Sequence, residues 1–291
     1  MPGVHNRLSA HESYALCERL TKSHYENFSV ASFLLLRERR KHFYAIYAYC
    51  RFVDDLGDEF DGDRLGALDY WQDETEACYY GEPSHPYMIA LRETVHAFDI
   101  PKEPLFSLID ANRMDQSITR YPTYRDLEYY CQHSANPVGH LVLYICGYRD
   151  EERQRLSDYT CTALQLANFW QDVSRDFAKG RIYIPLEDME AFDYTVEELA
   201  RHEATDGFRR LMRFQVERAR HLFEKGLPLV DMVGDRLKLD IALFSRGGMS
   251  VLDSIERQNY DVLGKRPVVG KGKKMQLLLS TLLKLKLLNR V

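Results

Sequence analysis

Hydrophobic residues recur along the chain at the three-to-four-residue spacing of α-helices, and alternating patterns are nearly absent. The two longest helical patterns cover residues 41–60 and 156–178, and Gly57 is their only internal Gly or Pro. The run RIYIP at residues 181–185 is the one short β-like stretch, and Gly and Pro residues separate the helical patterns. Further helices are predicted at residues 10–21, 64–80, 86–98, 103–117, 123–147, 195–202, 205–233 and 236–259.

These patterns predict one all-α domain that spans residues 1–291. No Pro- or Ser-rich linker divides the chain, and no internal repeat is visible. A length of 291 residues favours two domains but permits one large one. Hydrophobic residues make up 45% and charged residues 29%, which is typical of a globular protein with a sizeable core.

The charge and the cysteines of the chain indicate its partners and its cellular compartment. The formal net charge of −5 does not favour nucleic acid as a partner. Six scattered cysteines without a CxxC pair, no apolar leader and no run of about 18 apolar residues predict a cytoplasmic protein. From Val262 onwards, however, eight Lys or Arg and no acidic residue accompany a Leu-rich end. This end either contacts the inner face of an anionic membrane or packs on the domain as a helix.

Both long helical patterns carry a pair of aspartates one turn apart. Residues at i, i+4, i+7 and i+11 share one face of an α-helix, and polar residues precede each pair on the same face. The first face carries Tyr47, Arg51, Asp54 and Asp58, and the second carries Gln165, Asn168, Asp172 and Asp176.

A single pair of this kind is usually a solvated surface feature, because like charges at that spacing cost only a few tenths of a kcal/mol. Two such pairs on helices with apolar flanks favour a cation site, since carboxylates in an apolar setting need compensation. Mg²⁺ prefers oxygen ligands and often bridges carboxylates to phosphates. The pattern therefore predicts Mg²⁺-assisted departure of a diphosphate group.

Several motifs resemble the squalene/phytoene synthase family of head-to-head isoprenoid synthases, over nearly the whole chain. The resemblance implies an all-α isoprenoid-synthase fold with a central prenyl cavity, Mg²⁺ as cofactor and a prenyl diphosphate substrate. The motifs are HYENFSVAS at 24–32, YAIYAYCRFVDD at 44–55, YYCQHSANPVGHLV at 129–142 and LQLANFWQDVSRDFAKGRIYIP at 164–185.

The resemblance also implies roles for individual residues. Arg51 would pair with the diphosphate and Tyr47 would lie beside it, while Gln165 would face the cavity. The N-terminal motif would place His24, Asn27 and Phe28 near the substrate, and Tyr260 and Arg266 match later phosphate-side positions. The Mg²⁺ ligands would be Asp54, Asp58, Asn168, Asp172 and Asp176.

The motif FWQDV together with SANPVG, preceded by HYENF, makes the chain most similar to the bacterial hydroxysqualene synthase branch. Three positions depart from the common family pattern. Gln171 replaces an Arg, Arg175 replaces a Glu at the diphosphate end, and Asn136 introduces an amide into a segment that is usually small and apolar. The resemblance implies ionisation of presqualene diphosphate and capture of the rearranged cation by water, without NADPH, in a route that usually feeds hopanoids. Asn136 either orients that water or caps a helix break before Pro137.

Two other functions stay open at this point. Within the family, the chain would instead make presqualene diphosphate, squalene or phytoene by joining two prenyl diphosphates. Outside catalysis, it would be a prenyl-diphosphate-binding subunit that works with other enzymes of the squalene pathway. The presence of all four motif aspartates disfavours the second alternative, because a metal site needs them.

Overall fold

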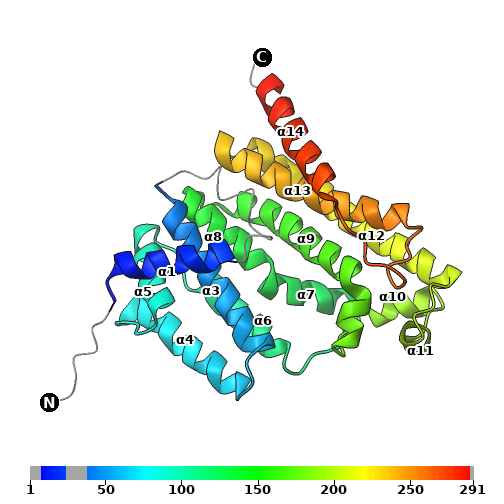
Figure 1. Cartoon of the computed structure of the whole chain (residues 1–291), viewed down its shortest axis with the longest axis horizontal. Coiled ribbons are helices and arrows are strands. Elements are labelled where there is room, and N and C mark those ends of the chain that lie inside the picture. The colour runs from blue at the N-terminus through cyan, green and yellow to red at the C-terminus, as the bar shows by residue number, and fades with distance from the viewer. Residues whose placement is uncertain (1–7, 24–37, 289–291) are drawn as a thin grey trace. The chain divides into compact units, whose positions relative to one another are not determined.

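The computed structural model describes residues 8–23 and 38–288. This part of the chain is helical apart from turns and one isolated parallel β-bridge, which joins Arg120 to Ile182 within the β-like run of the sequence. The predicted all-α class is therefore confirmed. Figure 1 shows these helices along the chain. The chain divides into two compact units, each built from two segments. The single domain over residues 1–291 stays a prediction.

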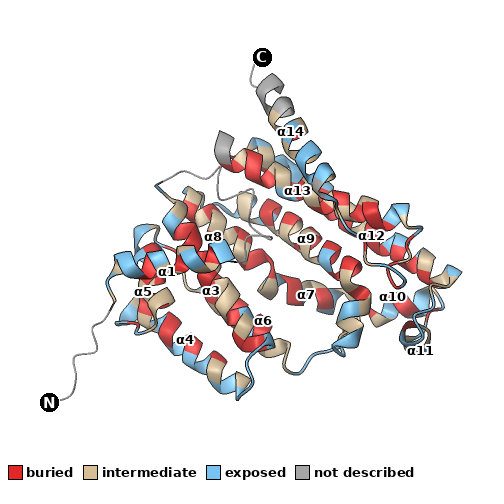
Figure 2. Cartoon of the chain, viewed as in Figure 1, coloured by how far each residue is buried: buried red, intermediate tan, exposed pale blue. Residues whose placement is uncertain are grey.

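Unit 1 comprises the chain up to Ser117 together with Pro137–Asp150. Its core surrounds Trp71 and Tyr49, which are fully buried and whose rings stack with centroids 5.8 Å apart. Apolar side chains on several sides of α3 are covered by neighbouring helices, as the buried residues along α3 show (Figure 2). The helices of unit 1 are α1 (Ala10–Ser23), α3 (Arg40–Asp58), α4 (Arg64–Tyr80), α5 (Pro86–Ala97), α6 (Glu103–Met114) and all but the first residue of α8 (Asn136–Cys146).

Unit 2 comprises residues 118–136 and the chain from Glu151 onwards. Its central element is α9, which packs along both α12 and α13. The last residue of α12 is Gly226, and a Cβ there would collide with Thr160 of α9, so the two helices approach closely only because this residue is Gly. The elements of unit 2 are α7 (Tyr124–Ser134), α9 (Glu151–Ala178), α10 (Leu186–Ala191), α11 (Val196–Ala200), α12 (Asp206–Gly226), the 3₁₀ turn η1 (Leu227–Asp231), α13 (Asp235–Arg257) and α14 (Lys271–Leu288).

The single helix predicted over residues 123–147 was wrong. Instead α7 ends at Ser134, Ala135 follows it as the C-cap, and α8 starts at Asn136. Pro137 explains the break, because it has no backbone N–H to donate and it disfavours helical geometry at the residue before it. Pro228 has a similar effect further along, where α12 gives way to η1 instead of continuing to residue 233.

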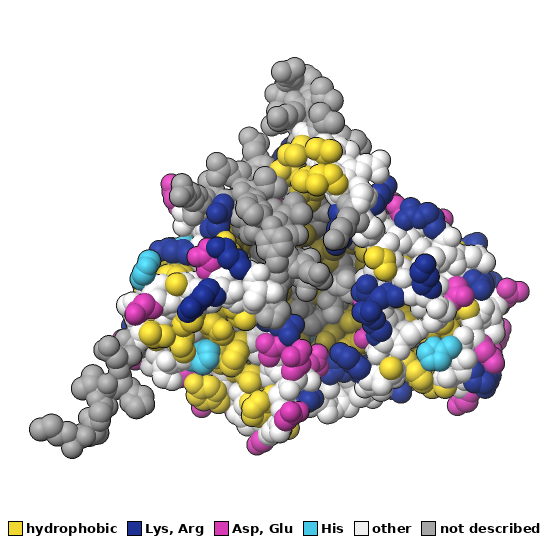
Figure 3. Space-filling view, in the orientation of Figure 1, with side chains coloured by type: hydrophobic (Ala, Val, Ile, Leu, Met, Phe, Trp, Pro, Cys, Tyr) yellow, Lys and Arg dark blue, Asp and Glu magenta, His cyan; other side chains and the backbone are white. Residues whose placement is uncertain are grey.

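The C-terminal helix α14 packs on α13 but keeps part of its surface open. Arg246 of α13 donates to Ser280 Oγ at 2.9 Å and also to Thr281 Oγ1. On the described part of α14, hydrophobic side chains remain exposed, namely Met275 and Leu279 (Figure 3). Over the residues with described structure, no helix combines the length and the apolar character that crossing a membrane would require.

Candidate functional site

The acidic stretch at the end of α3 divides into two sets of carboxylates. Arg51 forms ion pairs with Asp55 and with Glu59, the latter at 3.0 Å. These partners lie at i+4 and i+8 from Arg51, along a stripe that borders the face with Asp54 and Asp58, and the positive charge of Arg51 still acts on the carboxylate of Asp54. Asp55 and Glu59 therefore act as counter-ions of Arg51, which leaves Asp54 and Asp58 as the carboxylates with a candidate chemical role.

Asp54 is supported by a side chain of α6. Asn112 Nδ2 donates a long hydrogen bond of 3.4 Å to Asp54 Oδ1, and Gln116 Nε2 donates to the backbone oxygen of Gly57 at 3.0 Å. A Cβ on Gly57 would collide with Asn112, so this glycine permits the close approach of α6 to α3. The Asp54 side chain is exposed, yet desolvation by the protein around it raises its pKa to about 6, against the opposing effect of the Asn112 hydrogen bond.

Tyr47 and Asp58 complete the predicted face of α3. Tyr47 is half-buried, and desolvation raises the pKa of its hydroxyl group. Asp58, the last residue of α3, is exposed. The carboxylates of Asp54 and Asp58 thus remain accessible on one side of the helix, with the partly buried phenol two turns before them.

The second acidic pair lies at a kink in α9. Asp172 has backbone angles of φ −110° and ψ 16°, which are outside the helical range, so the residues on either side belong to two helical segments with different directions. This region of backbone space is sparsely populated and is frequent at active sites. The straight helix predicted over residues 156–178 therefore needs correction, because Asp176 does not continue the ideal face that carries Gln165 and Asn168.

Around the kink, the predicted residues differ in exposure. Gln165 is half-buried and Asn168 is exposed, both before the kink. Asp176, after the kink, is half-buried and lines a small pocket with Arg181 and the aromatic rings of Phe169 and Tyr183, which stack with centroids 3.8 Å apart.

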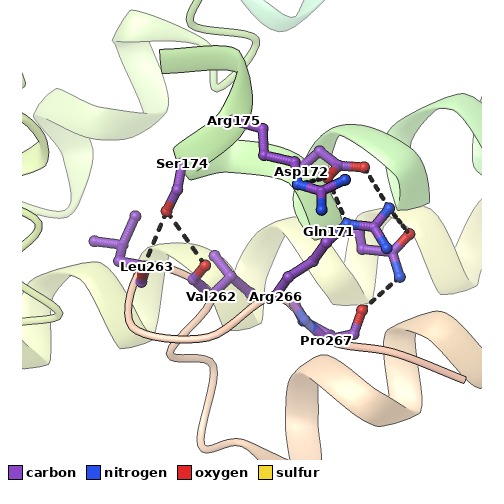
Figure 4. A network of polar contacts seen from close by, with 8 residues as sticks. All are labelled: Gln171, Asp172, Ser174, Arg175, Val262, Leu263, Arg266 and Pro267. Carbon is purple, nitrogen blue, oxygen red and sulfur yellow. Dashed lines mark hydrogen bonds and ion pairs between the residues drawn. The ribbon is translucent and has the colours of Figure 1, made fainter. Parts of the chain in front are cut away.

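The carboxylate of Asp172 is held by arginines. Arg266 donates from Nε to Oδ1 at 2.6 Å and from Nη2 to Oδ2 at 2.7 Å, which is a bidentate pair (Figure 4). The guanidinium of Arg175 lies 3.5 Å from Oδ1, and its side chain is 66% exposed. The structure thus brings together three predicted residues that are separated by up to 94 positions in the sequence.

Tyr260 lies close to this group in the chain but has a different environment. It is buried, and the guanidinium of Arg213 lies 5.2 Å from its ring centroid. Tyr260 and the preceding Asn259 both have positive φ angles, of 59° and 52°. Such angles strain residues other than Gly, so two in succession mark a sharp corner that the surrounding contacts hold in place.

Asn136 is buried at the start of α8. Its Oδ1 accepts a hydrogen bond of 2.9 Å from Thr162 Oγ1 of α9. Thr162 precedes Gln165 by three residues, so this polar contact lies on the part of α9 that was predicted to face the substrate. The predicted residues His24, Asn27 and Phe28 lie outside the described residues.

Sequence reasoning missed Asn112, Gln116 and the role of Gly57. It noted Gln171 only as a departure from a pattern, whereas its buried side chain bonds to both Arg266 and Pro267. Gly57, next to the acidic end of α3, was the one available sign that α6 approaches α3 closely. No local sequence pattern points to Asn112.

The side chains present allow only a partial protein site for Mg²⁺. Among the described residues, no three acidic, His or Cys side chains gather as a metal-binding group. Mg²⁺ often takes only one or two carboxylates and obtains other ligands from water and substrate phosphates. Within unit 1, the accessible pair Asp54 and Asp58 fits such a partial site. Within unit 2, the carboxylate of Asp172 is occupied by Arg266.

Similar proteins agree on the fold and on the class of enzyme. A phytoene synthase from Arthrospira platensis is 32% identical over 286 residues, which cover 92% of this chain and 91% of that protein. The crystal structure of squalene synthase HpnC from Alicyclobacillus acidocaldarius is 48% identical, with a TM-score of 0.85 over 87% of this chain and 96% of that one. A dehydrosqualene synthase in complex with ligand is 25% identical, with a TM-score of 0.87 over 95% and 98% of the two chains.

The family model described as squalene/phytoene synthase matches residues 21–273, a range that includes both aspartate pairs, Asn136 and Arg266. This match agrees with the helical fold and with the resemblance seen in the motifs. The chain belongs to the squalene/phytoene synthase family of head-to-head prenyl synthases.

Proposed function

We propose that this chain converts presqualene diphosphate and water into hydroxysqualene and diphosphate. The C–O bond to the diphosphate breaks, the cyclopropylcarbinyl cation rearranges, and water adds to the rearranged cation and loses a proton. The buried Asn136–Thr162 hydrogen bond carries the proposal, because it puts polar groups into a segment that the family usually keeps apolar. The 48% identity to a squalene synthase, against 32% to a phytoene synthase, supports a C30 substrate.

The chain's own residues bind the diphosphate and orient the water in this proposal. Asp54 and Asp58 of α3 would hold Mg²⁺, as would Asn168, Asp172 and Asp176 of α9. When bound, Mg²⁺ neutralises the charge that develops on the departing diphosphate. Arg51, Arg175 and Arg266 supply positive charge for the same group. The ring of Tyr47 lies beside it, and the Asn136 amide orients the attacking water.

The second candidate is a synthase that joins two prenyl diphosphates to presqualene diphosphate, squalene or phytoene. The curated relatives favour it, since the phytoene synthases of Arthrospira platensis and of a Synechocystis strain are 32% and 31% identical to this chain. The two candidates share the aspartate pairs and differ in substrate and in the fate of the cation.

Incubation with presqualene diphosphate and Mg²⁺, in H₂¹⁸O and without NADPH, separates the candidates by mass spectrometry of the lipid product. We expect a hydroxylated C30 product that carries ¹⁸O, with no change when NADPH is added. Asn136→Ala should lower or scatter hydroxylation while diphosphate release continues. Squalene in proportion to added NADPH would contradict the proposal, as would condensation of farnesyl or geranylgeranyl diphosphate without any turnover of presqualene diphosphate.

We also propose that the cytoplasmic enzyme associates with the inner face of the cell membrane through its C-terminal region. Met275 and Leu279 expose apolar surface on α14, and Lys274 beside them is exposed as well. Apolar insertion combined with lysine charge is the usual way in which a peripheral helix binds anionic lipid.

A further inference from the structure

The segment Asp261–Pro267, named here the C-terminal strap, is fastened to the second aspartate motif at three points (Figure 4). Ser174 Oγ lies 3.4 Å from the backbone oxygen of Val262 and 3.2 Å from that of Leu263. Gln171 Nε2 donates to the backbone oxygen of Pro267 at 2.6 Å. The third point is the bidentate pair between Arg266 and Asp172.

The strap has a defined shape of its own. It begins directly after the left-handed corner at Asn259 and Tyr260. Asp261 Oδ1 then accepts hydrogen bonds from the backbone N–H groups of Leu263 at 3.1 Å and Gly264 at 3.0 Å, which closes a turn. Because this turn is formed within the strap, Arg266 can leave Asp172 without the whole strap losing its fold.

The contact between Arg266 and Asp172 satisfies the carboxylate that the family chemistry would give to a cation. Both of its oxygens accept a charged N–H group, and Arg175 adds further positive charge at 3.5 Å. A divalent cation and the guanidinium cannot both occupy this carboxylate, since like charges at such short distance repel strongly. A diphosphate group, in contrast, attracts the guanidinium as a bidentate partner.

Gln171 explains why the arginine can bind where it does. Its buried side chain accepts from Arg266 Nη2 at 3.1 Å through Oε1 and donates to Pro267 through Nε2. A cationic side chain at position 171 would repel Arg266 and would have no acceptor to offer it. The neutral amide therefore positions the strap and its arginine on Asp172.

We propose that Arg266 is an exchangeable counter-ion of Asp172, placed by Gln171. Without metal, the guanidinium occupies the carboxylate. When a divalent cation and a diphosphate bind together, Arg266 transfers to the diphosphate and Asp172 turns to the cation. No covalent bond changes in this exchange. The inference rests on the proposed diphosphate chemistry, and it makes metal binding at α9 depend on the diphosphate.

The test measures binding of Mn²⁺ to the full chain by electron paramagnetic resonance, with and without inorganic pyrophosphate. For Mn²⁺ alone, Arg266→Gln should bind about tenfold more tightly than the unaltered chain, because both hydrogen bonds that compete for the Asp172 carboxylate are lost. Pyrophosphate should tighten Mn²⁺ binding strongly in the unaltered chain and much less in Arg266→Gln. Arg266→Lys, which keeps the charge but cannot form the bidentate pair, should fall between them.

Two controls make the result specific. Arg220→Gln removes a positive charge elsewhere in unit 2, where it pairs with Asp253 and Glu256, and it should leave Mn²⁺ affinity unchanged. In the Asp172→Asn background, Arg266→Gln should no longer raise Mn²⁺ affinity, because the contested carboxylate is gone. The proposal would be overturned if Arg266→Gln raised Mn²⁺ affinity equally in the Asp172→Asn background, or if Arg266→Gln alone did not raise it.

The role of Gln171 has its own readout. Gln171→Leu removes both amide bonds and should tighten binding of Mn²⁺ alone, but only while Arg266 is present. If Gln171 had only a structural role, Gln171→Leu would change Mn²⁺ affinity equally with and without Arg266. That outcome would refute the role of Gln171 in positioning Arg266. The assays use Mn²⁺ and pyrophosphate only, so they hold or fail independently of whether the lipid product is hydroxysqualene.

Discussion

At the scale of single residues, the aspartates of the two motifs have different partners. Asp54 is exposed and has one long hydrogen bond from Asn112, whereas both oxygens of Asp172 are bound by Arg266. Under the proposed function, this difference means that Asp54 accepts a cation directly, whereas Asp172 accepts one only after Arg266 has left its carboxylate.

Replacement of either aspartate by alanine should lower turnover by at least about 100-fold, because the leaving diphosphate loses charge stabilisation. The fold should persist, since Asp54→Ala removes a desolvated carboxylate from a crowded acidic helix end. Steady-state assays at saturating Mg²⁺ and thermal unfolding measure the two effects. Near-normal turnover in Asp172→Ala would falsify the cation-site interpretation.

A third aspartate outside the motifs predicts a pH effect on stability. Asp240 of α13 is 2% exposed, neither carboxylate oxygen has a hydrogen-bond partner in the described part of the chain, and desolvation raises its pKa to about 8. Between pH 4 and 8 the folded chain holds a proton that the unfolded chain has lost, so this group makes the fold less stable as pH rises.

Asp240→Asn should therefore raise the free energy of unfolding more at pH 8 than at pH 5, by on the order of 4 kcal/mol. Denaturant unfolding at the two pH values measures the difference. Ser245→Ala, which removes a buried hydroxyl group that does not titrate from the same helix, serves as the control and should change the free energy of unfolding equally at the two pH values. A gain from Asp240→Asn that is equal at both pH values would contradict the stated cause.

At the scale of helices, the approach of α6 to α3 depends on one missing side chain. Gly57→Ala should displace Asn112, weaken its bond to Asp54 and lower the free energy of unfolding by about 1–3 kcal/mol. Gly247 is the matched control, because it lies within α13 and no atom of the described residues comes within 4 Å of its missing Cβ. Gly247→Ala should stabilise by about 0.5–1 kcal/mol. Thermal unfolding of both variants measures these changes. If both substitutions changed the free energy of unfolding in the same direction, the steric explanation for Gly57 would be wrong.

Local pattern predicted most helices because apolar spacing reports which face of a helix is buried. It predicted α3 and α9 and placed both aspartate pairs on them. The pattern did not predict the kink at Asp172, and it ran one helix over residues 123–147 although Pro137 itself signalled a break, because a long apolar pattern can run across an interruption of the backbone. Nor could it predict that Asn112 reaches Asp54 or that Arg266 reaches Asp172. Those contacts join residues 58 and 94 positions apart, and neither contact produces a periodic signal.

At the scale of the whole molecule, membrane association should depend on the surface of α14 as well as on charge. Deleting residues 275–291 should weaken sedimentation with anionic vesicles at low salt, but it also removes the contacts of Arg246 with Ser280 and Thr281. Met275→Gln combined with Leu279→Gln keeps those contacts and should weaken binding as well. As the control, Tyr80→Gln removes an exposed aromatic side chain of unit 1 and should leave vesicle binding unchanged. If the unaltered protein does not sediment with these vesicles, the membrane proposal is wrong.

The discontinuity of unit 1 has a consequence for the order in which the protein is made. Leu141 and Ile145 of α8 belong to the same buried core as Trp71, yet a ribosome adds them after the 19 residues from Ile118 to Asn136 that belong to unit 2. A nascent chain that stops at Ser117 has all of α3 but lacks part of the core that encloses it. The first aspartate pair is thus translated early and becomes fully supported only when synthesis has passed Asp150.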